Sequence, residues 1–71
     1  MYLQVDKTKA TLALARACMN RAELAKRSGV PAPTIGRMLQ GYNTTPMTVG
    51  LIAKALNVDI LEILADETEN K

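Results

Sequence analysis

Apolar residues recur along most of this chain at the three- and four-residue intervals that are typical of short amphipathic helices. The first such stretch has Ala10, Leu14 and Ala17 on one face, which predicts a helix that ends at about residue 17. Asp6 stands just before it and can accept a hydrogen bond from the backbone of the first turn. The stretch therefore has both the apolar face and the cap of a surface helix.

Two more helices are predicted in the middle of the chain. Asn20 and Glu23 form a pair like a capping box, which opens a second helix that ends at Gly29. Pro33 lacks a backbone N–H and is best placed at the first position of a third helix, where the donor is not needed. That helix is expected to run to about Gln40.

The last two predicted helices also have recognisable starts. Thr45 followed by proline opens a fourth helix that runs through Leu56. Asp59 and Glu62 make another capping pair, which predicts a fifth helix ending at about Ala65. The connections between the five helices are short, so residues 7–65 are expected to form one domain.

The two ends of the chain differ from this pattern. Residues 2–5 alternate apolar and polar side chains, so residues 1–6 are either an arm that frays or a short strand. Such a strand would need a partner, and a second copy of the chain could supply it. Residues 66–71 are polar and are expected to be disordered.

Composition limits the kinds of protein that this chain can be. With 71 residues and two aromatic side chains, it has room for one small core of aliphatic residues and methionine. The net charge of +2 is unevenly distributed, because residues 1–43 carry +5 and residues 44–71 carry −3. A basic half of this kind favours a nucleic-acid partner.

Several classes of chemistry lack the residues that they need. The chain has no histidine and a single cysteine, Cys18, which excludes an internal disulfide and a Cys/His zinc site. We interpret Cys18 as a small buried filler rather than a redox sensor, and Asp59, Glu62 and Asp66 as capping residues rather than a cation site. No catalytic constellation, cofactor, metal or small-molecule ligand is implied. The absence of a membrane-spanning run and of a signal peptide favours a cytoplasmic location.

The stretch from residue 21 to residue 38 has the spacing of two short crossed helices. Small Ala25 allows close approach, Gly29 can adopt a positive φ, and Val30, Ile35 and Met38 face inward. This pattern is typical of a helix-turn-helix that recognises DNA.

The chain resembles the phage Cro/cI-type (XRE-like) helix-turn-helix family over about residues 7–65. The residues that carry the resemblance are Asn20-Arg21-Ala22-Glu23-Leu24-Ala25, Gly29-Val30, Thr34-Ile35, Arg37-Met38, Gly41, and the run from Ile52 to Leu64. The resemblance implies an all-α fold, namely a compact five-helix domain like that of lambda repressor, with the helix-turn-helix at helices 2 and 3.

The resemblance also implies which residues would contact double-stranded DNA. The positions that recognise bases correspond to Ala32, Pro33, Thr34, Gly36 and Arg37, and those that bind phosphate to Asn20, Arg21, Gln40, Tyr42, Asn43 and Thr44. Ala32 and Pro33 replace polar residues that are common at the start of the recognition helix. Arg37 is then the only long charged side chain among the base-reading positions, so binding is expected to depend mainly on phosphate contacts and DNA shape.

Alternatives stay open for several of these residues. Arg21 and Arg37 are either DNA contacts or ordinary surface charges, and Tyr42 either contacts the DNA backbone or covers the edge of the core. Leu12 and Leu61 fall outside the inward faces of their helices. Leu61 is the candidate for a dimer interface, and both are alternatively scattered exposed apolar residues.

The sequence therefore predicts a DNA-binding regulator, most simply a repressor that binds operator DNA as a homodimer. Phage or mobile-element repressors and the antitoxins of toxin–antitoxin pairs both fit, and an antitoxin would add a toxin as partner. The alternative is a protein-interaction module that has kept the fold and lost most direct base recognition. No membrane partner is expected.

Overall fold

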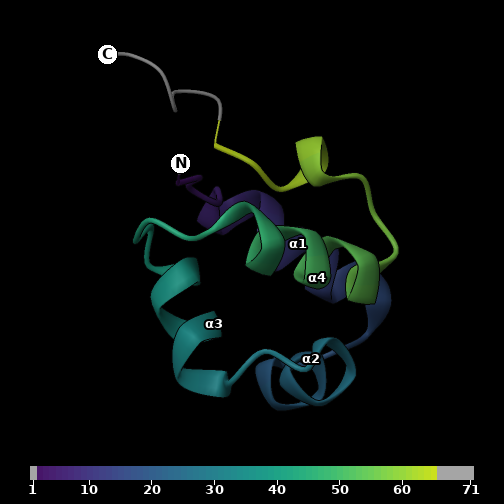
Figure 1. Cartoon of the computed structure of the whole chain (residues 1–71). Coiled ribbons are helices and arrows are strands. Elements are labelled where there is room, and N and C mark those ends of the chain that lie inside the picture. Colours follow the sequence, from purple (N-terminus) through teal and green to yellow (C-terminus); the bar gives the residue numbers. More distant parts are fainter. Residues whose placement is uncertain (1, 66–71) are drawn as a thin grey trace.

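The computed structural model describes residues 2–65, which form four α-helices and one short 3-10 turn (Figure 1). The elements are α1 (Lys7–Ala17), α2 (Arg21–Ser28), α3 (Ala32–Leu39), α4 (Pro46–Leu56) and the 3-10 turn η1 (Ile60–Glu62). The all-α class is confirmed, whereas the expected count of five helices is wrong. The tail at 66–71, predicted to be disordered, lies outside the described residues.

Side-chain caps start three of the helices where the sequence placed them. Asp6 accepts a hydrogen bond from the Lys9 backbone N–H at 2.9 Å, and Asn20 accepts one from that of Glu23 at 2.8 Å. Thr45 caps α4 in the same way, more weakly at 3.4 Å. Each cap satisfies a backbone donor that the first turn leaves without a helical partner.

Cys18 ends α1 in a left-handed conformation, with φ of 55°, and its side chain is exposed. Its backbone N–H bonds back to carbonyls of the last turn of α1. The expectation of a buried filler is therefore wrong, because the residue occupies the C-cap position at which the chain turns away from the core.

The start of α3 differs slightly from the prediction. The helix begins at Ala32, which places Pro33 at the second helical position rather than the first. The missing N–H of Pro33 still falls in the first turn, where no helical acceptor is available. Thr34 and Ile35 donate their backbone N–H groups to the Pro31 carbonyl, at 3.0 and 3.1 Å.

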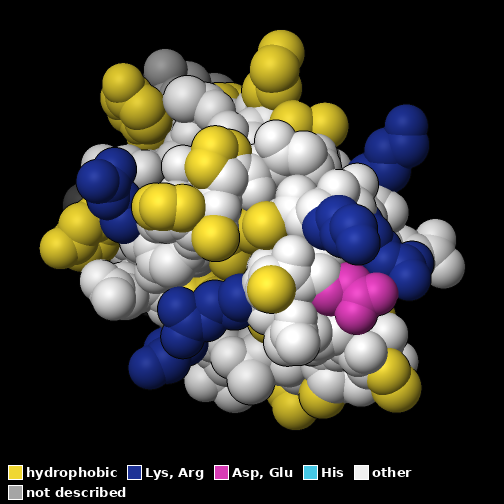
Figure 2. All heavy atoms as spheres, turned by 90° about the horizontal axis from the view of Figure 1, so that it is seen from below, with side chains coloured by type: hydrophobic (Ala, Val, Ile, Leu, Met, Phe, Trp, Pro, Cys, Tyr) yellow, Lys and Arg dark blue, Asp and Glu magenta, His cyan; other side chains and the backbone are white. Residues whose placement is uncertain are grey.

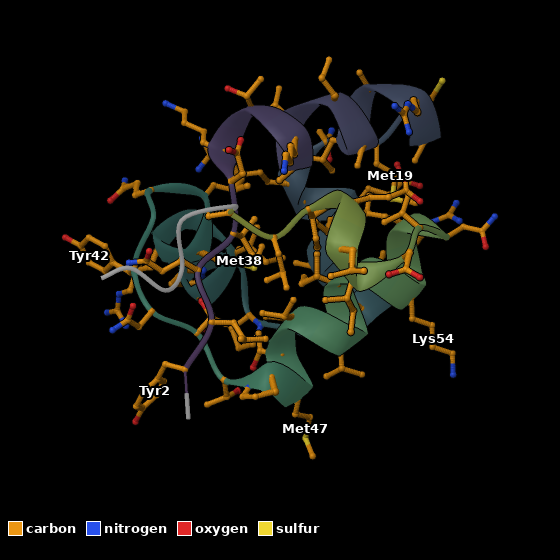
Figure 3. All side chains as sticks on the ribbon, turned by 90° about the horizontal axis from the view of Figure 1, so that it is seen from above. Tyr2, Met19, Met38, Tyr42, Met47 and Lys54 are labelled. Carbon is orange, nitrogen blue, oxygen red and sulfur yellow. The ribbon has the colours of Figure 1, made fainter. Side chains whose placement is uncertain are left out.

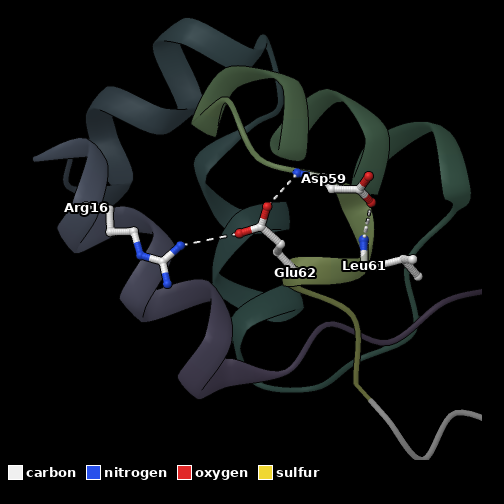
Figure 4. A network of polar contacts seen from close by, with 4 residues as sticks. All are labelled: Arg16, Asp59, Leu61 and Glu62. Carbon is white, nitrogen blue, oxygen red and sulfur yellow. Dashed lines mark hydrogen bonds and ion pairs between the residues drawn. The ribbon is translucent and has the colours of Figure 1, made fainter.

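The predicted fifth helix is reduced to the single turn η1. Its capping box forms as expected, since Asp59 accepts from the Leu61 N–H at 2.9 Å and Glu62 accepts from the Asp59 N–H at 3.2 Å (Figure 4). The helix does not continue because the next backbone groups bond elsewhere. The Ile63 carbonyl accepts from Asp6 and the Ala65 N–H donates to Gln4, at 2.8 and 3.0 Å.

The N-terminal segment is held within its own chain rather than frayed. Leu3 and Thr44 exchange two backbone hydrogen bonds of 2.7 and 2.8 Å, and Val5 forms a bridge with Leu64. Val5 is only 2% exposed, so its side chain belongs to the core. In this structure, residues 3–5 thus find within the chain the partners that a second copy would otherwise have to supply.

The core lies where all the elements meet. Its most completely buried large side chains come from α2, α3, α4 and the segment after η1, and they are Leu24, Ile35, Met38, Ile52, Ile63 and Val49. Met38 points into this interior (Figure 3). α2 packs on α4 and α3 packs on α2, which fixes the position of the outward faces of both helices. Within residues 2–65, no helix is both long and apolar enough to cross a membrane.

Candidate nucleic-acid interface

The α2–α3 pair has the turn that its sequence predicts. Gly29 ends α2 with φ of +78°, a conformation that a side chain would strain. Val30 is buried immediately after it, and its N–H donates to the Ser28 hydroxyl at 3.1 Å. The half-buried Ala25 lies on the side of α2 that packs on the core. These contacts set α3 across α2 in the way that a helix-turn-helix requires.

The outward edge of α3 offers few polar side chains. Ala32, Pro33 and Arg37 are exposed, whereas Thr34 and Gly36 are half-buried. All five candidate base-reading residues thus lie on one short helix, and Arg37 is the longest of them. Gln40, a candidate phosphate contact, is exposed directly after the end of the helix.

Two of the four arginines of the chain form ion pairs with glutamates, and the other two do not pair with any described residue. Arg16 bonds to Glu62 at 3.3 Å (Figure 4), and Arg27 bonds to Glu23 at 3.1 Å. Arg21 and Arg37 are exposed and form no ion pair or side-chain hydrogen bond with any other residue in the 2–65 segment. Both of these uncompensated charges belong to the helix-turn-helix, so they are available to an anion.

The end of the molecule that carries α2 and α3 has a positive character. Viewed from that end, Lys and Arg side chains stand out in several places, while Asp or Glu is visible in one small area only (Figure 2). Apolar and uncharged surface lies between the basic groups. A surface of this kind is complementary to duplex DNA, in which partly apolar base edges lie between two rows of negatively charged phosphates.

Three polar side chains that are suited to contact DNA lie close together at the start of α2. Lys7 of α1 lines the same shallow hollow as Asn20 and Arg21. The Asn20 side chain is occupied as the cap of α2, as described above, and remains exposed. Lys7 was not among the predicted site residues, because only the tertiary fold brings the first residue of α1 beside the start of α2.

The loop after α3 presents two of its three predicted contact residues. Tyr42 is 57% exposed and points away from the body of the molecule (Figure 3), so it does not cover the core edge. Asn43 is exposed as well. Thr44, however, is 7% exposed and donates its hydroxyl to the Tyr42 carbonyl at 3.2 Å. Thr44 therefore holds the loop in place and is not accessible to a phosphate.

The fold and this surface are those of a helix-turn-helix protein. Comparison with protein-family models agrees, since the model described as Helix-turn-helix matches residues 16–63, more than half of the chain. The chain belongs to this family, in its Cro/cI-type (XRE-like) branch, and is thereby a DNA-binding transcription regulator rather than a member of an enzyme family. No curated protein and no solved structure matches it.

Proposed function

We propose that this protein is a repressor that recognises operator DNA as a homodimer, with α3 in the major groove. Arg37 then contacts a base edge, while Arg21, Gln40, Tyr42 and Asn43 lie against the DNA backbone. The remaining edge of α3 contributes apolar contacts to thymine methyl groups. Because α3 has few donors, most of the affinity comes from phosphates and from the shape of the duplex.

The observation that carries this proposal is the division of the arginines. An exposed guanidinium without a carboxylate partner keeps its full charge for a ligand, whereas a paired one is already partly neutralised. Among the described residues, the unpaired arginines are the two that face outward from α2 and α3. Two of the three arginines of the helix-turn-helix thus keep their full charge, whereas Arg27 on α2 and Arg16 on α1 do not.

A second surface supports the homodimer. Leu61 of η1 is 74% exposed and lines one hollow together with Leu12 of α1, which is also exposed. Arg16 and Glu62 border the same hollow with charges of both signs. An apolar centre with mixed charges beside it suits contact with an identical surface. Since η1 lies at the other end of the molecule from α2 (Figure 1), such a contact leaves the DNA-facing side open.

Selection from a random pool of duplex DNA, with the mass of the bound complex measured alongside, tests the proposal. We expect a symmetric site with two half-sites about 34 Å apart, bound by two copies of the chain. Binding should weaken steeply with added salt, as phosphate contacts require.

The exposed apolar edge at Ala32 and Pro33 favours one competing function, a protein-interaction module that has kept the fold and lost most direct base recognition. In that case the chain would select no DNA sequence and would show no binding at low salt. That result would overturn the repressor proposal.

A further inference from the structure

Gly36 leaves a gap on the outward side of α3, and the Arg21 side chain lies at this gap. A Cβ atom placed on Gly36 would stand 3.6 Å from Arg21 Nη1, which is ordinary van der Waals contact. The tip of a side chain from the first residue of α2 thus reaches the middle of the recognition helix. No carboxylate within residues 2–65 draws it there.

The position of the guanidinium along α3 is informative. Residues four apart lie on one row of a helix, so Ala32, Gly36 and Gln40 form a row. This row has no donor between its start and Gln40, because neither Ala32 nor Gly36 carries a polar side chain. The Arg21 guanidinium lies beside the middle of the row, where a longer side chain at position 36 would otherwise project.

We propose that Arg21 recognises a base, most suitably guanine, across the gap at Gly36, so that α2 supplies a donor that α3 lacks. This inference rests on the proposed function and changes the role of Arg21 within it. A planar guanidinium can donate two parallel hydrogen bonds to O6 and N7 of guanine in the major groove. Arg21 and Arg37 then determine sequence specificity together, from two different helices.

The competing role for Arg21 is a phosphate clamp, for which its place at the start of α2 is also suitable. A clamp needs only a positive charge near the backbone, and lysine supplies that as well. A base contact needs the two-pronged geometry of arginine. The Arg21→Lys variant therefore separates the two roles, because it keeps the charge and removes the fork.

The experiment measures binding of the full chain to its selected site and to single-base variants of that site, over a range of salt. For Arg21→Lys we expect one position in each half-site to lose its preference, by roughly 5- to 150-fold. The salt dependence should stay close to that of the original protein, because the number of phosphate contacts is unchanged. Arg27→Lys, on the same helix and paired with Glu23, is the matched control and should alter neither quantity.

Gly36→Gln provides an independent test, since its side chain would displace the guanidinium from α3. We expect it to alter the preference at the same base position as Arg21→Lys, with thermal unfolding confirming that the variant folds. If Arg21→Lys keeps every base preference, the inference is overturned and Arg21 is at most a clamp. If the original protein itself selects no sequence, the proposed function fails and this inference fails with it.

Discussion

At the scale of single residues, function here depends on which side chains remain without a partner. A paired arginine such as Arg16 of α1 has its charge partly neutralised by Glu62, the residue that also caps η1. An unpaired one such as Arg37 adds little to the folded state and leaves its charge for another molecule. The two kinds of arginine should therefore respond differently to the same substitution.

Arg37→Ala should reduce discrimination between the selected DNA site and its variants by about 1–3 kcal/mol, as expected for loss of a bidentate base contact. Titration of labelled duplexes that carry single-base changes measures this loss. Arg27→Ala, at an arginine that is paired with Glu23, is the control of the same residue type and should leave the DNA preference intact. Full affinity and unchanged preference in Arg37→Ala would show that this residue does not recognise a base.

Two glycines should respond to alanine in opposite directions. Gly36→Ala should stabilise the fold by up to about 1 kcal/mol, because helical geometry suits alanine and the new Cβ meets Arg21 at an ordinary distance. Gly29→Ala should cost about 1 kcal/mol or more, since its φ of +78° strains a side chain. Chemical denaturation of both variants gives the free energies of unfolding. A destabilised Gly36→Ala protein would mean that Arg21 packs more tightly on α3 than this spacing allows.

Some residue-level features lay beyond the sequence. Lys7 joins the start of α2 only through packing, and the burial of Thr44 depends on its pairing with Leu3. In both cases the partner residues are more than ten positions apart in the sequence, so no local sequence pattern predicts the contact. The inward residues Ile35 and Met38 of α3, in contrast, could be predicted because apolar positions recur with the period of a helix, whereas the candidate base-reading positions came from the family resemblance.

At the scale of elements, the same distinction between local and distant partners separates correct from incorrect predictions. The starts of α1, α2 and α4 were predictable because their caps lie within three residues of the backbone groups that they bind. The capping box of η1 was predictable for the same reason. The length of η1 was not, because residues 63–65 bond to residues 4–6 at the other end of the chain.

The N-terminal segment should consequently contribute to stability. Val5→Ala removes part of a fully buried side chain and should cost about 2 kcal/mol of unfolding free energy. That is a large share of the roughly 3–5 kcal/mol that a core of this size supplies. Thermal or urea unfolding measures the change, with the exposed Tyr2→Ala as control. Equal stability of the two variants would show that the segment does not belong to the cooperative core.

At the scale of the whole molecule, the proposed DNA surface and the proposed dimer surface use different residues. The first is built from α2, α3 and the loop that follows, with Lys7 from the start of α1, and the second from η1 and Leu12 of α1. Assembly and DNA contact can therefore be altered separately. A variant that no longer dimerises should nevertheless bind DNA more weakly than the dimer does, because each bound copy then contributes its contacts alone.

Leu61→Asp should convert a dimer into a monomer, since it places a charge at the centre of the apolar contact. Light scattering or sedimentation measures the mass in solution. The residue is so exposed that the stability of the monomer should change by no more than about 0.5 kcal/mol. Met47→Asp, at a site on α4 that is 77% exposed, is the matched control. A mass that is the same in both variants would remove Leu61 from the interface.

The pairing of residues 4–6 with residues 63–65 also governs when the domain can finish folding during synthesis. Residues 4–6 are synthesised long before residues 63–65, so their backbone groups and Val5 must wait for that later segment before they find their partners. Until then the α2–α3 unit can form local helices on an incomplete core. A chain that ends after α4 would thus leave Val5 and the backbone groups of Gln4 and Asp6 without their partners.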